Sequence, residues 1–189
     1  MRSLKSFSIW IILLVFVSLA SFSCKRGGPA GPEIPPVACS PTPDMVYFTG
    51  DLITVQSCIF EITLKSIATM DIIDKYPARK GMYLLPEVNV KNIAAAIGDN
   101  ATMWYISYKL FYVEDGDGTR YYQDDVNYRS QIYAFFPGLF TNAYCAMYNT
   151  GQQTGYRKLI FDVPKDAKDL VLTFHSTESN NIIKFHLGI

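Results

Sequence analysis

The chain has 189 residues, of which 49% are hydrophobic and 18% are charged, a balance that suits one folded domain and is unlike that of a disordered chain. Seventeen basic and seventeen acidic residues leave a formal net charge of +0 at pH 7. A protein that binds nucleic acid by neutralising phosphates needs a basic surplus, so the composition excludes that class of partner.

The first 23 residues predict a signal peptide. Two positive charges precede an unbroken apolar run over residues 9–17, and the small residue Ser23 stands immediately before Cys24. This segment resembles the lipobox of bacterial lipoproteins, although Ser21 replaces the leucine that usually lies three positions before the cysteine. The resemblance implies that Cys24 is acylated and becomes the mature N-terminus. Cleavage to a soluble exported protein and retention as a signal anchor are the alternatives.

Residues 24–43 predict a tether that holds the following domain away from the bilayer. This stretch contains six prolines and three glycines, and proline favours extended backbone. A loop packed on the domain is the alternative. Lys25 and Arg26 follow the cysteine and no aspartate stands there. By resemblance to proteobacterial sorting, this favours the outer membrane or the cell surface over the inner membrane.

Three cysteines remain if Cys24 carries lipid, namely Cys39, Cys58 and Cys145. An exported chain enters an oxidising compartment, so one disulfide is expected. We predict the pair Cys58–Cys145, because both lie in strand-like segments, with Cys39 as the alternative partner. No CxxC spacing occurs, and neither a metal site nor a cofactor is predicted.

From residue 44 onward, short β-rich segments alternate with turns rich in glycine, asparagine, aspartate and proline. The predicted strands are residues 57–67, 82–93, 103–113, 119–123, 143–148, 158–163, 169–174 and 182–187. Residues 103–113 carry aromatic side chains on both faces, as a central strand does. Residues 66–75 and 90–97 each predict at most one helical turn. Seven or eight such strands over residues 44–189 predict an all-β domain, an immunoglobulin-like antiparallel β-sandwich.

Three features of the second half occur in an order that is found in a known family. They are VNVKN at residues 88–92, DGDGTRYY at residues 115–122, and a G-x-x-x-G segment that leads from Gly151 to Pro164. Residues 82–189 thereby resemble the telokin-like, immunoglobulin-like domains of bacterial exported proteins and lipoproteins. The resemblance implies export and a sandwich fold, and it supplies no catalytic residues. The register between residues 136 and 152 stays open.

Four aspartates, Asp115, Asp117, Asp124 and Asp125, cluster around a turn. Counted from Asp115, position twelve of an EF-hand loop is Val126, which cannot supply the required carboxylate. We therefore predict a solvated hairpin turn, with an irregular calcium site as the alternative.

The only two histidines, His175 and His186, lie near the ends of the last two predicted strands and are able to face each other. The sequence contains no nucleophile elbow, P-loop, HExxH or dinucleotide-binding motif. A non-catalytic protein is therefore predicted. A small exported hydrolase with an unrecognised site is an alternative, and its turnover would depend on one of these histidines.

Residues 131–140 contain the strongest candidate for a contact surface. Phe135, Phe136, Leu139 and Phe140 surround a Pro-Gly pair. These side chains either plug one end of the sandwich or form an exposed loop that binds a partner.

The sequence predicts a cell-envelope lipoprotein with a binding or scaffolding sandwich, attached to a membrane by lipid, with an unidentified protein partner. An accessory subunit that docks on an envelope complex through residues 131–140 is the alternative.

Overall fold

The computed structural model describes residues 45–57, 59–94, 103–136, 138–141, 145–177 and 181–189. All of these residues belong to one compact unit. The predicted signal peptide, Cys24, Cys39 and Cys58 lie outside the described residues. Among the residues that are described, no helix is long and apolar enough to cross a membrane.

The first sheet, here called sheet A, contains five strands in the order β1-β14-β13-β8-β9. Their bounds are Val46–Tyr47 (β1), Phe111–Glu114 (β8), Arg120–Tyr121 (β9), Val171–Ser176 (β13) and Asn181–His186 (β14). β1 pairs with β14 in parallel, and the other neighbours pair antiparallel. β13 and β14 confirm the hairpin that was predicted at the C-terminus.

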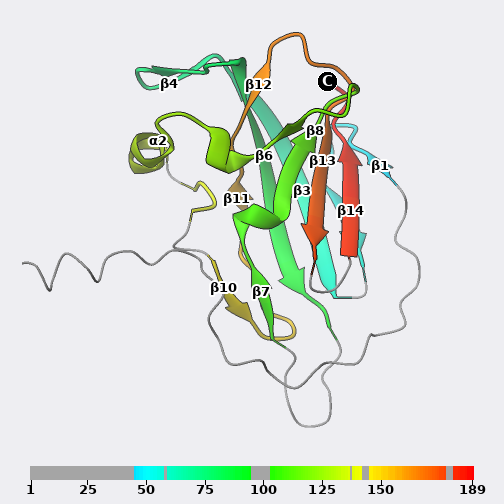
Figure 1. Cartoon of the computed structure of the whole chain (residues 1–189). Helices are drawn as coiled ribbons and strands as arrows, with labels where there is room; N and C mark the ends of the chain where they lie inside the picture. The colour runs from blue at the N-terminus through cyan, green and yellow to red at the C-terminus, as the bar shows by residue number, and fades with distance from the viewer. Residues whose placement is uncertain (1–44, 58, 95–102, 137, 142–144, 178–180) are drawn as a thin grey trace, which may run out of the picture. The chain divides into compact units, whose positions relative to one another are not determined.

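The second sheet, here called sheet B, has the strand order β11-β6-β3-β2, and β12 also pairs with β6. Its strands are Ile53–Gln56 (β2), Phe60–Met70 (β3), Gly81–Asn92 (β6), Arg157–Lys158 (β11) and Phe161–Pro164 (β12). Two short ribbons complete the β structure: β4 (Ile72–Ile73) with β5 (Tyr76–Pro77), and β7 (Trp104–Ile106) with β10 (Ala146–Tyr148). Figure 1 shows β8, β13 and β14 in front of β3 and β6.

The core lies between the two sheets because apolar and polar residues alternate along their strands. Phe60, Ile62 and Leu64 of β3 are fully buried. The ring of Phe174 on β13 lies 5.1 Å from the ring of Phe60 and 5.1 Å from that of Phe111. The contact between Phe174 and Phe60 joins sheet A to sheet B, and this packing confirms the predicted all-β sandwich.

Residues 103–113 do not form the single central strand that the sequence predicts. The segment comprises β7, a 3-10 turn η1 (Tyr108–Leu110) and β8, and its two strands belong to different sheets. Ser107 begins the turn, since its hydroxyl accepts a hydrogen bond from the backbone N–H of Lys109 at 3.2 Å. The aromatic residues appear on both faces because the chain changes sheets within the segment.

Other differences concern short elements. The helical turn predicted over residues 66–75 is wrong, because these residues form the end of β3 and the β4–β5 hairpin. For the second predicted helical turn, residues 90–92 end β6 and residues 95–97 lie outside the described part of the chain.

A 3-10 turn η2 (Gln123–Asp125) follows β9, and a helix α2 (Arg129–Phe135) begins where a loop was expected. The α2 residue Ile132 is fully buried in a second apolar cluster with Leu85 of β6, so packing stabilises this short helix.

Candidate functional site

The outer surface of sheet A is the first candidate contact surface, and we call it the sheet A face. Its members point away from the core, because Val113, Leu172 and Phe174 of the same strands are buried and alternate with them. The sheet A face consists of Tyr47, Tyr112, Glu114, Arg120, Val171, His175, Ile182, Lys184 and His186, with Tyr122 directly after β9, and these side chains surround Thr173, which is 1% exposed.

Aromatic and cationic groups stack at the β9 end of this face. The rings of Tyr112 and Tyr122 lie 5.8 Å apart, and the guanidinium of Arg120 lies 4.7 Å from the centre of the Tyr112 ring. Arg120 also donates to the carboxylate of Glu114 at 2.7 Å. Tyrosine and arginine in such arrangements are enriched at protein contact surfaces.

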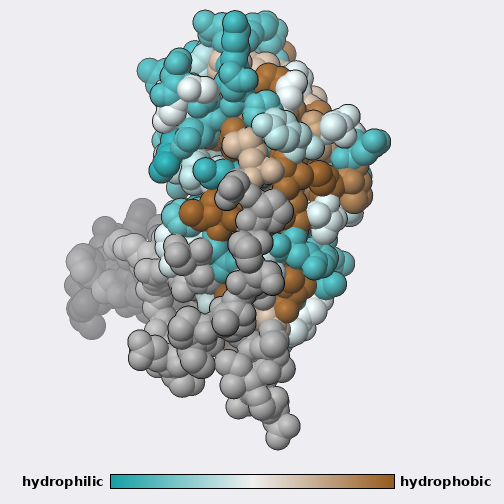
Figure 2. All heavy atoms as spheres, turned by 90° about the vertical axis from the view of Figure 1, so that its right-hand side faces the viewer, coloured by the Kyte–Doolittle hydropathy of each residue, from teal (hydrophilic) through white to brown (hydrophobic). Residues whose placement is uncertain are grey.

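The opposite end of the sheet A face, at β1 and β14, combines rings with exposed aliphatic groups. Tyr47 is 65% exposed and its ring lies 4.9 Å from that of His186. Ile182 is 41% exposed. Figure 2 faces the side on which β1 and β14 lie and shows apolar surface along the middle of that side, below a hydrophilic top.

The outer surface of sheet B differs from the sheet A face. One part is covered, because Tyr83 and Leu85 are buried in the second apolar cluster. The rest carries charges that pair with one another: Lys65 with Glu87 at 3.2 Å and Lys91 with Glu61 at 3.8 Å. This polar surface is typical of the solvated side of an antiparallel sheet, whereas the sheet A face departs from that pattern.

A small open pocket of about 200 Å³ adjoins the sheet A face. It lies between η1 and η2, and Tyr122 belongs both to the pocket and to the sheet A face. The lining residues are Tyr108, Lys109, Phe111, Tyr122, Gln123, Asp124 and Asp125.

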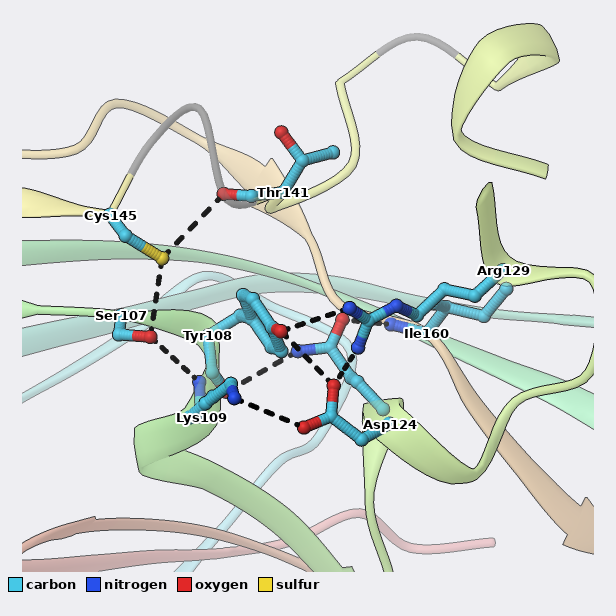
Figure 3. Close-up of polar contacts among 9 residues, drawn as sticks. Ser107, Tyr108, Lys109, Asp124, Arg129, Thr141, Cys145 and Ile160 are labelled. Atoms are coloured by element: carbon cyan, nitrogen blue, oxygen red, sulfur yellow. Dashed lines mark hydrogen bonds and ion pairs between the residues drawn. The ribbon is translucent and has the colours of Figure 1, made fainter. Parts of the chain in front are cut away.

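Asp124 is the centre of a set of polar contacts beside this pocket (Figure 3). Its carboxylate accepts from the Tyr108 hydroxyl at 3.0 Å, pairs with the Lys109 ammonium at 3.4 Å and contacts the Arg129 guanidinium. Arg129 also lies 4.9 Å from the centre of the Tyr108 ring. Asp124 is therefore already satisfied by groups of the protein itself.

Gln123 fixes the base of the pocket. Its side chain is 2% exposed, accepts from the backbone N–H of Ile160 at 3.1 Å and donates to the backbone carbonyl of Tyr108 at 3.3 Å. These bonds join η2 to η1 and to the residue that precedes β12. Sequence reasoning missed Gln123, because nothing in the local pattern marks a glutamine as buried.

The predicted contact segment, residues 131–140, is mostly not exposed. Leu139 is 1% exposed and Phe140 is fully buried, while Phe136 is half-buried. Phe140 packs in the main core and Leu139 in the second cluster, because α2 folds this segment against the sandwich. Exposure of Leu139 and Phe140 is therefore wrong, because both fill the fold, whereas docking through the rest of this segment stays a prediction. The side chain of Phe135 lies outside the described part of the structure.

The thiol of Cys145 lies at the end of β7 (Figure 3). It lies 3.3 Å from the hydroxyl of Ser107 and 3.8 Å from the backbone carbonyl of Thr141. Its proposed partner Cys58 lies outside the described residues, so the disulfide stays a prediction.

The four clustered aspartates separate into two groups. Asp115 organises its own turn: one carboxylate oxygen accepts from the backbone N–H groups of Asp117 and Thr119, and the other accepts from the Tyr121 hydroxyl at 2.6 Å. Asp124 pairs with Arg129. Within the described ranges, no group of acidic, cysteine or histidine side chains is arranged to hold a metal ion.

The two histidines do not face each other. In the β13–β14 register, His175 lies opposite Ile182, whereas His186 lies opposite Val171, four positions along the strand. His186 instead lies 3.7 Å from Asp169 and accepts from the backbone N–H of Gly188. The expected juxtaposition is wrong, because an antiparallel hairpin places residues near its tip far from residues near its ends.

Replacing Tyr121 with phenylalanine is expected to raise the pKa of Asp115. The hydroxyl of Tyr121 is the main cause that holds this pKa below its usual value, and backbone N–H groups add to it. A lowered folded-state pKa contributes stability above the unfolded-state pKa, and that contribution is lost as the pH falls through the folded-state value. NMR titration of the Asp115 carboxyl checks this, with Tyr122→Phe as the control. An unchanged Asp115 titration in Tyr121→Phe contradicts it.

No family model and no curated protein matches the chain. Among solved structures, the chain is similar to MPT63, a secreted protein from Mycobacterium tuberculosis, with a TM-score of 0.49 and 16% sequence identity. The match covers 78% of this chain and 99% of that chain. A likeness of this strength shows neither the function of this chain nor its export.

Proposed function

We propose that this protein is an exported cell-envelope lipoprotein whose sandwich is a non-catalytic binding module, with the sheet A face as its contact surface. The observation that carries the binding role is the contrast between the two outer surfaces. Sheet B is covered or carries paired charges, whereas the sheet A face presents stacked tyrosines and an exposed Ile182. An exposed aromatic and aliphatic surface of this kind marks a contact site.

The leader supports export and anchoring through acylated Cys24. Removal of residues 1–23 takes away Arg2 and Lys5 and leaves 15 basic against 17 acidic residues, a net charge of −2. Such a chain gains nothing from anionic lipid headgroups overall, so membrane attachment depends on the acyl chains. A telokin-like family relationship agrees with this role and belongs to the same proposal.

The chemistry of the sheet A face predicts what its protein partner offers. Glu114 already neutralises Arg120, whereas Lys184 forms no ion pair with any residue in the described part of the chain. The partner surface is therefore apolar around Ile182 and acidic opposite Lys184. Tyr112 and Tyr122 provide rigid contact area at low entropic cost.

Photo-crosslinking in intact cells of the native host tests the contact surface. Benzoylphenylalanine replaces Ile182 on the sheet A face in one variant and Tyr156, next to β11 of sheet B, in the control; the two side chains are 41% and 38% exposed. We expect a discrete adduct with the Ile182 variant and none with the Tyr156 variant. Equal adducts from both positions, or an adduct from Tyr156 alone, would refute the assignment of the face.

A further inference from the structure

We infer that the pocket between η1 and η2 binds one pyranose ring, such as the terminal sugar of an envelope glycan. The inference rests on the proposed binding role of the sandwich, and it names a ligand class for the pocket that adjoins the sheet A face. It follows from the size of the pocket, its exposed ring, its polar groups and the rigidity of its base.

The size of the pocket limits the ligand to one small ring. Its volume is about 200 Å³, below the roughly 300–1,000 Å³ of clefts that enclose larger ligands. Because the pocket is open to solvent, the ring can be the end of a longer chain that extends outward across the sheet A face.

Tyr122 provides a platform on which the ring can stack. Its side chain is 42% exposed, and the neighbouring Tyr112 ring holds it at 5.8 Å. The face of an aromatic ring is electron-rich and attracts the weakly positive C–H groups on one side of a pyranose. Tyr108 cannot serve in this way, since it is buried and Arg129 lies over its ring.

The polar groups of the pocket suit a neutral ligand with hydroxyls. Lys109 and Asp124 are about half exposed and pair with each other, so an anionic ligand would have to compete with Asp124 for Lys109. Asp125 is exposed, and no group in the described part of the chain donates to its carboxylate. Sugar hydroxyls can donate to Asp125 and accept from Lys109 without a change in net charge.

The base of the pocket is preorganised. Gln123 is bonded to the backbone at Ile160 and Tyr108, and Asp124 is held by Tyr108, Lys109 and Arg129. Groups that are fixed before binding lose little entropy when the ligand enters. A weak ligand such as a single sugar can therefore be retained.

Saturation-transfer NMR on the full chain in detergent micelles tests the inference, with a panel of methyl pyranosides as the probes. We expect transfer to the ring protons of at least one pyranoside. Tyr122→Ala should weaken binding about fivefold, which corresponds to the loss of one aromatic contact. Tyr156→Ala, which removes a similarly exposed tyrosine near sheet B, should leave binding unchanged. Circular dichroism confirms that both variants fold.

Three outcomes would overturn the inference: no transfer to any pyranoside, binding that is equally strong in Tyr122→Ala, or transfer to choline or arginine in place of the sugars. The cellular crosslink at position 182 reports on the sheet A face independently of this pocket. A crosslink without sugar binding refutes the sugar site alone, and the absence of the crosslink refutes the proposed contact surface.

Discussion

Phe174→Ala is expected to lower the free energy of unfolding by about 3–5 kcal/mol. Phe174 is fully buried in β13, and its ring contacts Phe60 of sheet B and Phe111 of sheet A edge-on, each at 5.1 Å. Alanine removes the buried ring, leaves a cavity between the sheets and abolishes both ring contacts. Urea unfolding measured by the fluorescence of Trp104, whose ring lies 6.0 Å from that of Phe60, checks this result.

Two control variants make the result specific. Phe174→Leu keeps most of the buried volume and should cost much less than the alanine variant. Tyr47→Ala removes a ring that is 65% exposed and should change stability by less than about 0.5 kcal/mol. A loss below about 1 kcal/mol for Phe174→Ala would show that this ring does not join the two sheets.

Asp162→Ala is expected to cost about 2–4 kcal/mol, because it removes a buried acceptor for two backbone donors. The side chain is 3% exposed, and its two oxygens accept from the backbone N–H groups of Arg79 and Lys80, each at 2.9 Å. These bonds fix the connection between β5 and β6 against β12. Alanine leaves both donors without their acceptor.

Asp162→Asn supplies the matched comparison, since an amide keeps one acceptor oxygen and should lose about half as much as alanine does. Urea unfolding gives the two losses, and amide hydrogen exchange at Arg79 and Lys80 locates them. Equal protection of these amides in the native and alanine proteins would contradict the role assigned to Asp162.

The sequence allowed the main strands to be predicted because their patterns are local. Alternating apolar residues identify β3 and β6, and the same rule gives the β13–β14 hairpin. Pro164 is the last residue of β12, because proline has no N–H for the sheet. The break at Ser107 was missed, since it depends on β7 pairing with β10, about forty residues further along the chain.

The candidate contact surface could not be predicted from the same patterns. In β13, the buried Leu172 and Phe174 alternate with Val171 and His175, which are half-buried on the other side, and nothing in the residue types shows which side faces the core. Only the packing of sheet A on sheet B determines which side stays exposed. The aromatic segment around Phe140 was a candidate contact surface because of its composition. Composition does not show that α2 folds this segment inward.

The pocket depends on contacts that are distant in sequence. Gln123 is held by Ile160, and Asp124 is held by Tyr108 and Arg129. The four clustered aspartates were recognised from the sequence, and a solvated hairpin turn was predicted for them. That interpretation fits Asp115, whose carboxylate organises its own turn.

Export and anchoring through Cys24 are the central claim, because they decide where the sheet A face meets its partner. Metabolic labelling with a palmitate analogue, followed by mass spectrometry of the mature N-terminus, tests this claim directly. We predict a labelled protein that begins at an acylated Cys24, and complete loss of the label in Cys24→Ser. An unlabelled native protein, or a mature chain that begins at another residue, would contradict the account.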